Sequence, residues 1–226
     1  EKVKEKKRFS FYGFILSKIQ HYNPKKYWKM REEVVNPKSK KSTLKRLWYL
    51  YRIKRSDAFN NASMGTDLNS GAQFASPPNL PHHLNGIIIS HFAKIGKNCV
   101  IFQNVTIGGV TTAGSSNDGA PQIGDNCYIC SGAILVGKIN IGNNVRISST
   151  CIRCKKSITI DDDVRLGADA ILLDTDSHNL DWRIRCDLKN RSNDSKTAKS
   201  APIHICQGVL IGARSIILKG VTIGEH

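Results

Sequence analysis

The chain has 226 residues, with 34 Lys and Arg against 18 Asp and Glu, and a formal net charge of +16. This length is enough for one or two domains with a hydrophobic core. Its apolar runs are far shorter than the roughly 20 residues of a membrane-spanning helix, and no nucleic-acid-binding motif accompanies the charge. The composition therefore gives no reason to expect a transmembrane segment or a nucleic-acid partner.

The positive charge is concentrated in the first quarter of the chain. Residues 1–55 contain 18 Lys and Arg and only 4 Asp and Glu. The sequence of this part, which prolines divide into segments, predicts helices over 9–21, 27–35 and 43–54. We therefore expect residues 1–62 to form a basic α-helical segment. Two roles stay open for it: a cap on the following domain, or, through Trp and Tyr side chains between the basic residues, binding to an anionic membrane surface.

From residue 89 onward, a bulky aliphatic residue recurs at every sixth position within each uninterrupted block. The series is Ile89, Ile95, Ile101, Ile107, Ile123, Ile129, Leu135, Ile141, Ile147, Ile160, Leu166, Leu172, Ile205, Ile211, Ile217 and Ile223. Neither an α-helix nor an ordinary β-strand has this period, whereas fixed hexads indicate a β-helix. We predict an all-β solenoid over residues 63–226, in which three hexads, about 18 residues, close one triangular coil and successive coils stack ~4.8 Å apart.

Three interruptions break the hexads, and loops on a rigid scaffold commonly carry function. A Gly- and Ser-rich excursion occupies 109–122, and a longer one occupies 174–203. The third is a single extra residue before Ile160, which we expect to turn Cys154 into the interior in place of Arg153. The 174–203 loop is the first place to look for chemistry, because long loops inside compact domains are usually functional.

The seven cysteines suggest a metal site at first sight. Cys127-x2-Cys130 and Cys151-x2-Cys154 have a spacing close to that of a zinc ribbon. The hexad phase argues against zinc, because Cys127 and Cys151 both take the small inward position but at different corners of the coil. We therefore expect no metal. An odd number of cysteines indicates reduced thiols and a cytoplasmic location, with the basic helices allowing a place at the membrane periphery.

His178, in the long loop, is the first candidate for a general base. Asp174, Asp176 and Asp181 lie close to it in sequence. A neutral imidazole is suited to accept a proton near pH 7, and a neighbouring carboxylate can orient it and stabilise the imidazolium. We expect Asp176 to act with His178. The alternative from the residues alone is a polar loop histidine without a catalytic role.

The stretch from Ile160 to the end resembles the hexapeptide-repeat acyltransferases, in particular the maltose, galactoside and capsular-polysaccharide O-acetyltransferases. The resemblance rests on the segments Asp176-Ser-His178, Val209-Leu-Ile-Gly212 and Ile217-Leu-Lys-Gly220-Val-Thr-Ile-Gly224. It implies a left-handed parallel β-helix, a homotrimer, acetyl-CoA as cosubstrate and His178 as the base.

The same resemblance implies a CoA-binding set of residues near the end of the chain: Gly212, Ala213, Lys219 and Gly220. Within it, the backbone N–H of Ala213 would hold the thioester carbonyl. Acyl transfer needs such a donor where negative charge develops on oxygen, and a backbone N–H suffices.

Residues 80–147 resemble a related branch, the serine acetyltransferases. His83-Leu-Asn-Gly86 matches the catalytic His-x-x-Gly segment of that branch, and Asn104-Val-Thr-Ile-Gly-Gly109 matches its next coil. The resemblance makes His83 a second candidate base. Ala120 stands where that branch has another histidine, which weakens a serine-specific site.

We therefore predict an O-acetyltransferase acting on a hydroxyl of a sugar or glycan intermediate. Trp182 would offer a stacking face for the acceptor, and Asp176 or Asp181 would accept hydrogen bonds from its hydroxyls. Within the enzymes, the alternative is serine O-acetylation through His83. From another class, the alternative is a non-catalytic solenoid scaffold whose basic helices bind membranes, although the long loop argues against a pure scaffold.

Overall fold

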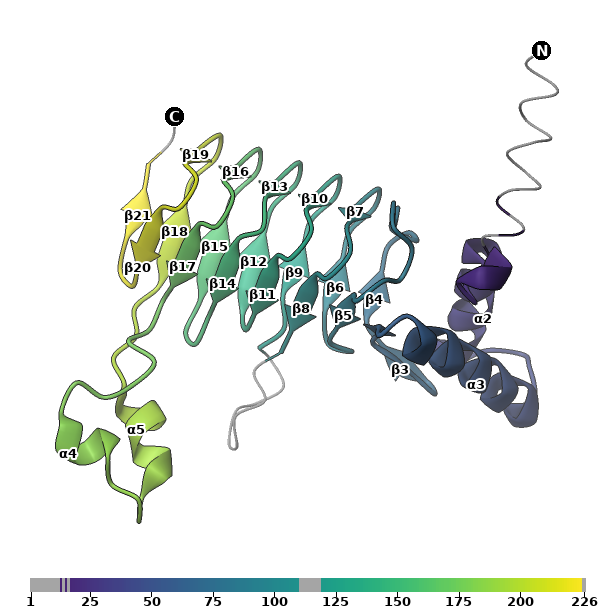
Figure 1. Cartoon of the computed structure of the whole chain (residues 1–226), viewed down its shortest axis with the longest axis horizontal. Helices are drawn as coiled ribbons and strands as arrows, with labels where there is room; N and C mark the ends of the chain where they lie inside the picture. Colours follow the sequence, from purple (N-terminus) through teal and green to yellow (C-terminus); the bar gives the residue numbers. More distant parts are fainter. Residues whose placement is uncertain (1–12, 14, 16, 110–118, 225–226) are drawn as a thin grey trace.

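The computed structural model describes residues 13, 15, 17–109 and 119–224. Its main body is a three-sided parallel β-helix of short strands, with one strand in each of three sheets per coil (Figure 1). Sheet I contains β1 (Ser63–Met64), β5 (Ile88–Ile89), β8 (Thr106–Gly108), β11 (Ile134–Val136), β14 (Cys151–Arg153), β17 (Ile171–Leu173) and β20 (Ile216–Leu218). Sheet II contains β7 (Val100–Ile101), β10 (Tyr128–Ile129), β13 (Arg146–Ile147), β16 (Arg165–Leu166) and β19 (Leu210–Ile211). Sheet III contains β4 (Gln73–Phe74), β6 (Lys94–Ile95), β9 (Gln122–Ile123), β12 (Ile139–Ile141), β15 (Ile158–Ile160), β18 (Ile203–Ile205) and β21 (Thr222–Ile223).

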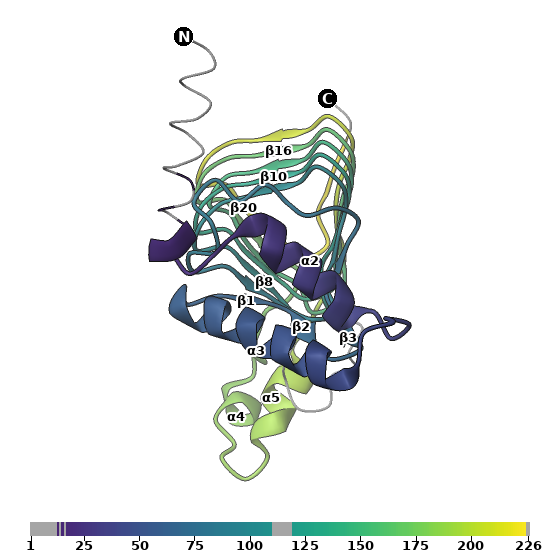
Figure 2. The ribbon, with the colours of Figure 1, turned by 90° about the vertical axis from the view of Figure 1, so that its right-hand side faces the viewer.

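The coils have the predicted length and hand. Tyr128 pairs with Arg146, 18 residues later, in the next coil of sheet II. Seen from the N-terminal end in Figure 2, the chain passes from sheet II at the top to sheet I on the diagonal lower side and then to sheet III, anticlockwise as the coils recede. This sense of winding is left-handed, so the predicted left-handed parallel β-helix is confirmed.

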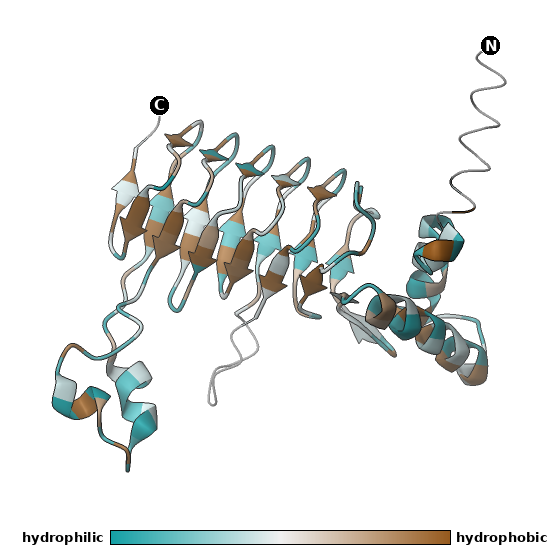
Figure 3. Ribbon diagram, viewed as in Figure 1, coloured by the Kyte–Doolittle hydropathy of each residue, from teal (hydrophilic) through white to brown (hydrophobic). Residues whose placement is uncertain are grey.

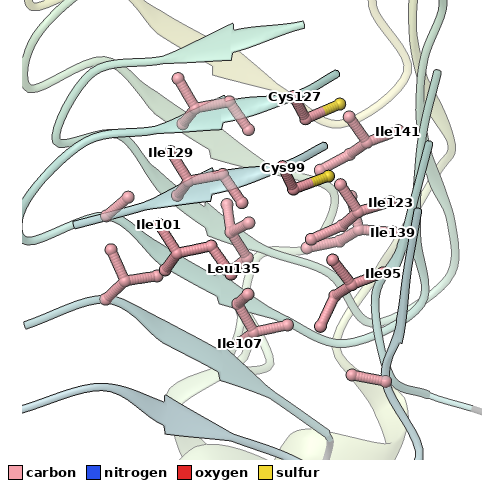
Figure 4. Close-up of a cluster of buried hydrophobic side chains, with 14 of the residues drawn as sticks. Ile95, Cys99, Ile101, Ile107, Ile123, Cys127, Ile129, Leu135, Ile139 and Ile141 are labelled. Atoms are coloured by element: carbon pink, nitrogen blue, oxygen red, sulfur yellow. The ribbon is translucent and has the colours of Figure 1, made fainter. Parts of the chain in front are cut away.

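The hexad residues fill the interior, as Figure 4 shows for the middle coils. Ile101, Ile107, Ile129 and Leu135 have no exposed surface. Each such side chain contributes about 1.5 to 3 kcal/mol on burial. The two sulfurs in this view, Cys99 and Cys127, lie inside the coil as the hexad phase predicts. The same expectation is wrong for Cys151, because Thr150 is the small buried residue of that coil and Cys151 points outward from β14.

The expectation for the third interruption is wrong. Ile152, and not Cys154, fills the inward position of sheet I, in register with Leu135 and Leu172. The corner before β14 is one residue shorter than the others, so the inward residue comes five positions after Ile147. Cys154 is buried at the next corner, with its Sγ 3.3 Å from the carboxylate of Asp174.

Two helices close the N-terminal end of the prism (Figure 2). They are α2 (Pro24–Val35) and α3 (Thr43–Phe59), and α3 continues beyond the predicted end at residue 54. Pro24 occupies the first turn of α2, where its missing N–H costs nothing. Of the predicted helix over 9–21, residues 13, 15 and 17–21 are described; 13, 15 and 17–19 are helical, and 20–21 form a turn. A short antiparallel hairpin, β2 (Thr66–Asp67) and β3 (Ser70–Gly71), lies between the helices and the first full coil.

Buried polar contacts hold these helices to the solenoid. The guanidinium of Arg31, which is 4% exposed, donates to the carbonyl oxygen of Ala72 at 2.6 Å and to Thr66 Oγ1 at 3.0 Å. A further buried bond joins the two helices to each other: the hydroxyl of Tyr27, on α2, donates to Asp57, on α3, at 2.6 Å. No helix in the described part of the chain is long and apolar enough to cross a membrane.

The outer faces of the three sheets differ in polarity. Figure 3 shows the strands of sheet I as largely hydrophobic and those of sheet III as more hydrophilic. The outward side chains of sheet I are mostly apolar: Ile88, Ile134, Val136, Ile171, Leu173, Ile216 and Leu218. Those of sheet III are polar: Lys94, Gln122, Asn140, Thr159, His204 and Thr222. Sheet I therefore presents an exposed apolar face that a single protomer leaves uncovered.

Candidate active site

The long loop leaves the solenoid after β17 and returns at β18, and it carries two short helices, α4 (Trp182–Arg185) and α5 (Arg191–Thr197) (Figure 1). Its base is fixed by Asp174, which is fully buried. The carboxylate of Asp174 accepts hydrogen bonds from the backbone N–H groups of Lys155, Lys156 and Ser157 at 2.6 to 2.9 Å. Asp174 therefore anchors the loop to the preceding coil and takes no part in orienting His178.

The imidazole of His178 is held by a carboxylate that its neighbours in sequence did not predict. Its Nδ1 lies 2.7 Å from Oδ2 of Asp194, in α5. The other oxygen of Asp194 accepts the backbone N–H of Asn179 at 2.7 Å. The hydrogen bond with His178 is the main reason that the pKa of Asp194 lies below its ordinary value. With Nδ1–H donated to Asp194, Nε2 carries the lone pair, and the His178 side chain is 66% exposed.

Asp176 contacts a different partner. Its carboxylate forms an ion pair with Lys219 on the last coil. Gly220 donates its N–H to the carbonyl of Pro202, at the other end of the loop, at 3.1 Å. His178 in turn donates its N–H to the carbonyl of Asp176 at 2.7 Å. The structure thus brings Asp176, His178, Lys219 and Gly220 to one corner of the prism, with Asp176 bridging the loop and the last coil.

The other two residues expected to bind CoA lie at another corner. Gly212 and Ala213 precede β20, whereas Lys219 and Gly220 follow it. A three-residue strand spans roughly 10 Å. Both Gly212 and Ala213 are exposed, and no acceptor among the described residues takes the N–H of Ala213. Within one protomer the strand β20 therefore separates this free donor from the end of the coil that contacts the His178 loop.

The two residues expected to bind the acceptor lie together at the start of α4. Asp181 is the N-cap of this helix, and its carboxylate accepts the N–H of Arg183 at 2.9 Å. Trp182 is 62% exposed, and the guanidinium of Arg183 lies 5.9 Å from its ring centroid. The indole is therefore accessible, while Asp181 is partly engaged in capping.

His83 lies far along the chain from this loop, at a corner of the first coil near the helices. Its backbone has φ +58°. Its ring meets that of Tyr22 edge to face, with the two ring centroids 5.7 Å apart. Burial, with His82 adding to it, lowers the pKa of His83. In the described part of the chain, no carboxylate contacts its ring. His83 therefore lacks the orienting acid that His178 has.

Sequence reasoning missed Asp194. It stands 16 residues after His178, behind two short helices, in a polar stretch that shows no periodicity. No spacing rule connects the two residues, because the fold of the loop alone brings them together.

No family model matches the chain. Over 88 residues, 39% of each chain, it is 35% identical to the serine acetyltransferase of Staphylococcus xylosus. Over 85 residues, 38% of this chain and 34% of its relative, it is 34% identical to the serine acetyltransferase of Synechococcus elongatus. A solved serine acetyltransferase from Brucella abortus strain S19 in complex with coenzyme A superposes with a TM-score of 0.37 and 23% identity, covering 57% of this chain and 41% of that one.

The chain thus spans about two fifths of the length of the curated relatives it matches. The coils have the geometry that the hexad pattern predicts. The chain is therefore a hexapeptide-repeat β-helix with a segment similar to the serine acetyltransferases.

Proposed function

We propose that the protein transfers an acetyl group from acetyl-CoA to a hydroxyl, with His178 as general base and Asp194 as the residue that positions it. The observation that carries the proposal is the 2.7 Å contact between His178 Nδ1 and Asp194, which leaves Nε2 exposed. Nε2 takes the proton of the acceptor hydroxyl, and the negative charge of Asp194 stabilises the imidazolium that forms.

The acceptor oxygen then attacks the thioester carbonyl of acetyl-CoA, and the carbonyl oxygen becomes an oxyanion. A backbone N–H without a partner, such as that of Ala213, is suited to stabilise this charge. When the intermediate collapses, the carbon–sulfur bond breaks, and the imidazolium returns its proton to the CoA thiolate. The products are the acetyl ester and free CoA thiol. No step of this sequence needs a metal ion.

The proposal includes a homotrimer, because β20 separates Ala213 from the His178 corner within one protomer. The base and the oxyanion donor must lie within a few ångströms of the same carbonyl, so they would come from adjacent copies. The apolar outer face of sheet I supports association. Ile216 and Leu218 on this face are 62% and 53% exposed.

For the acceptor we propose a sugar or glycan hydroxyl. The support is Trp182, an exposed indole in the same loop as His178, since aromatic faces pack well against the apolar faces of sugar rings. Serine is the competing acceptor, favoured by the sequence match to the serine acetyltransferases. Ala120, where a second histidine is expected, and the absence of a carboxylate at His83 in the described residues speak against a His83 site.

Release of CoA thiol tests the proposal. The protein is incubated with acetyl-CoA and a panel of acceptors that includes L-serine, nucleotide sugars and lipid-linked sugars, and the acetylated product is identified by mass spectrometry. We expect turnover with a sugar, lost in His178→Ala and retained in His83→Ala. Turnover with serine that is lost only in His83→Ala would transfer the role of base to His83. No thiol release with any acceptor would reject the enzyme.

We propose membrane association as a second function, carried by α3. Leu44, Trp48 and Tyr51 on this helix are 81%, 50% and 53% exposed, among basic residues such as Arg52. Apolar and aromatic side chains next to basic ones suit the interface of an anionic bilayer. This surface would hold the enzyme near a lipid-linked acceptor. Membrane binding would be the main function of the chain if the solenoid were only a scaffold.

A further inference from the structure

Glycine recurs at one corner of the prism, where each strand of sheet III ends. At the end of each strand of sheet III, the residue after the inward aliphatic is Gly96, Gly124, Gly142 or Gly224 in four of the coils. A Cβ at Gly96, Gly124 or Gly142 would come within 2.2 to 2.6 Å of atoms of the following coil. At these three positions the coils stack too closely for a side chain.

Ala75 takes this place after β4, in the first coil. Further along, two adjacent coils depart from the glycine pattern with larger side chains, Asp161 after β15 and Cys206 after β18. Ile160 pairs with Ile205 in the register, and Asp161 donates its N–H to the carbonyl of Ile205 at 2.9 Å, so the two departures are neighbours. Each places a potential metal ligand where the other coils of the column have glycine or, in the first coil, alanine. A random surface substitution would have no reason to occur twice in succession with ligand-bearing residues.

His204 completes the group. It lies in β18 between the buried Ile203 and Ile205, so its ring points outward. Its Nε2 is 2.8 Å from Oδ2 of Asp161, and ligand atoms of Asp161, His204 and Cys206 all lie within 4.8 Å of one another. In the part of the chain that the structure describes, no other group of three such residues is this close.

We propose that Asp161, His204 and Cys206 bind one divalent transition-metal ion, with Zn²⁺ as the best match. Imidazole nitrogen, thiolate sulfur and carboxylate oxygen are the usual ligands of zinc, whereas sulfur disfavours Mg²⁺ and Ca²⁺. Tetrahedral zinc with bonds of about 2.0 to 2.3 Å keeps its ligand atoms about 3.3 to 3.8 Å apart. Side-chain rotations that bring the three ligand atoms about 1 Å closer together would therefore convert the present cluster into a coordination shell.

The electrostatic setting agrees with this site. A thiolate and a carboxylate together neutralise the charge of the ion, and the residues that flank His204 on the neighbouring rungs are the neutral Thr159 and Thr222. All three ligands are partly exposed, so the ion can enter and a fourth position stays open to water. The site lies two residues after the long loop returns to the solenoid, and a bound ion would fasten β18 to β15 at that point.

The test is a titration of the untagged, chelator-treated full chain with Co²⁺, in a buffer with a phosphine reductant. We expect one equivalent to bind and to produce both the visible bands of a tetrahedral site and a near-ultraviolet sulfur-to-cobalt charge-transfer band, which Zn²⁺ then abolishes. The matched pair of variants is Cys206→Ser and Cys186→Ser, because Cys186 is exposed in the loop away from the cluster.

Cys206→Ser should lose the charge-transfer band, and His204→Asn should weaken Zn²⁺ binding at least about tenfold, while Cys186→Ser retains both. Zn²⁺ should also raise the melting temperature of the wild type, because a ligand that binds only the folded state stabilises it, and it should leave that of Cys206→Ser unchanged. Absence of a thiolate band in the wild type, or a band that survives in Cys206→Ser, would overturn the proposal. Acetyl transfer is not part of the readout, so this result is independent of the proposed enzyme.

Discussion

His178 Nδ1 and Asp194 Oδ2 lie 2.7 Å apart across a loop in which 16 residues separate them. His178→Ala should lower kcat by roughly 10² to 10⁴, the usual contribution of a general base. Asp194→Asn should lower it by about tenfold or more, because an amide no longer stabilises the imidazolium. Both are measured as thiol release at saturating acetyl-CoA. The control is Asp187→Asn, a partly exposed carboxylate of the same loop that accepts a hydrogen bond from Asn190 instead. Equal activity of Asp194→Asn and wild type would remove Asp194 from the mechanism.

The apolar face of sheet I should hold the assembly together. Ile171, near the C-terminal end of this face, points outward from β17. Ile171→Lys puts a charge into a buried contact between copies, which is costly without a partner. We expect light scattering to give a trimer for the wild type and a monomer for the variant. Thr159→Lys, on the polar face of sheet III, is the control and should stay trimeric. A monomeric wild type would contradict the proposed assembly.

The helical cap should depend on one buried guanidinium. Arg31 donates to the carbonyls of Met64, Gly65 and Ala72, and its Cζ lies 4.6 Å from the ring centroid of Phe74. Arg31→Ala removes the guanidinium donor from all three carbonyls and leaves that of Ala72 without the hydrogen bond described for it, and we expect the free energy of unfolding to fall by about 2 to 4 kcal/mol. Urea denaturation measures it.

Arg52→Ala provides the comparison for Arg31, because Arg52 is exposed on α3 and its described contact is with the ring of Trp48. It should change the free energy of unfolding by no more than about 0.5 kcal/mol. Similar losses in the two variants would mean that the buried carbonyl contacts do not stabilise the cap.

Asp57 should make the stability of the cap depend on pH. It is 3% exposed, and burial raises its pKa to about 6. In the unfolded chain an aspartate titrates near ~3.9, so the folded state binds the proton more tightly. The contribution of Asp57 is most favourable below that value and is lost as the pH rises through about 6.

Asp57→Asn keeps an acceptor for Tyr27 but cannot ionise. Relative to wild type, its free energy of unfolding should therefore increase by about 2 to 3 kcal/mol between pH 4 and pH 7, since two pKa units correspond to about that energy. Denaturation curves at several pH values give this difference. If the difference stayed constant with pH, Asp57 would not titrate in this range.

The exposed face of α3 should bind anionic vesicles. Wild-type protein should sediment with phosphatidylserine vesicles at low salt and not with phosphatidylcholine, and salt should release it because surface charges are screened. Trp48→Ala should weaken sedimentation several-fold. Trp182→Ala, which removes an exposed indole at the other end of the molecule, should not. Binding that ignores both lipid charge and salt would refute the proposed membrane surface.

The sequence by itself determined the coil. Inward aliphatic residues at every sixth position can all be buried only if the backbone turns through three corners in about 18 residues, and the register between Tyr128 and Arg146 has that period. The same rule located the long interruption between β17 and β18, whereas residues 110–118 of the predicted interruption at 109–122 lie outside the described residues. It failed at Ile152, because a one-residue change in a corner shifts the phase without changing the composition.

Only the tertiary structure decided which side chains meet. Asp194 reaches His178 because α4 and α5 fold the loop back on itself, and Asp176, the nearer residue in sequence, is drawn to Lys219 on the last coil. Asp161 and Cys206 are 45 positions apart in the chain and adjacent in space, because stacking of the coils joins them. The physical reason is the same in each case. Periodicity fixes where the backbone goes, whereas contacts between side chains depend on loop folds and coil stacking, which no local pattern encodes.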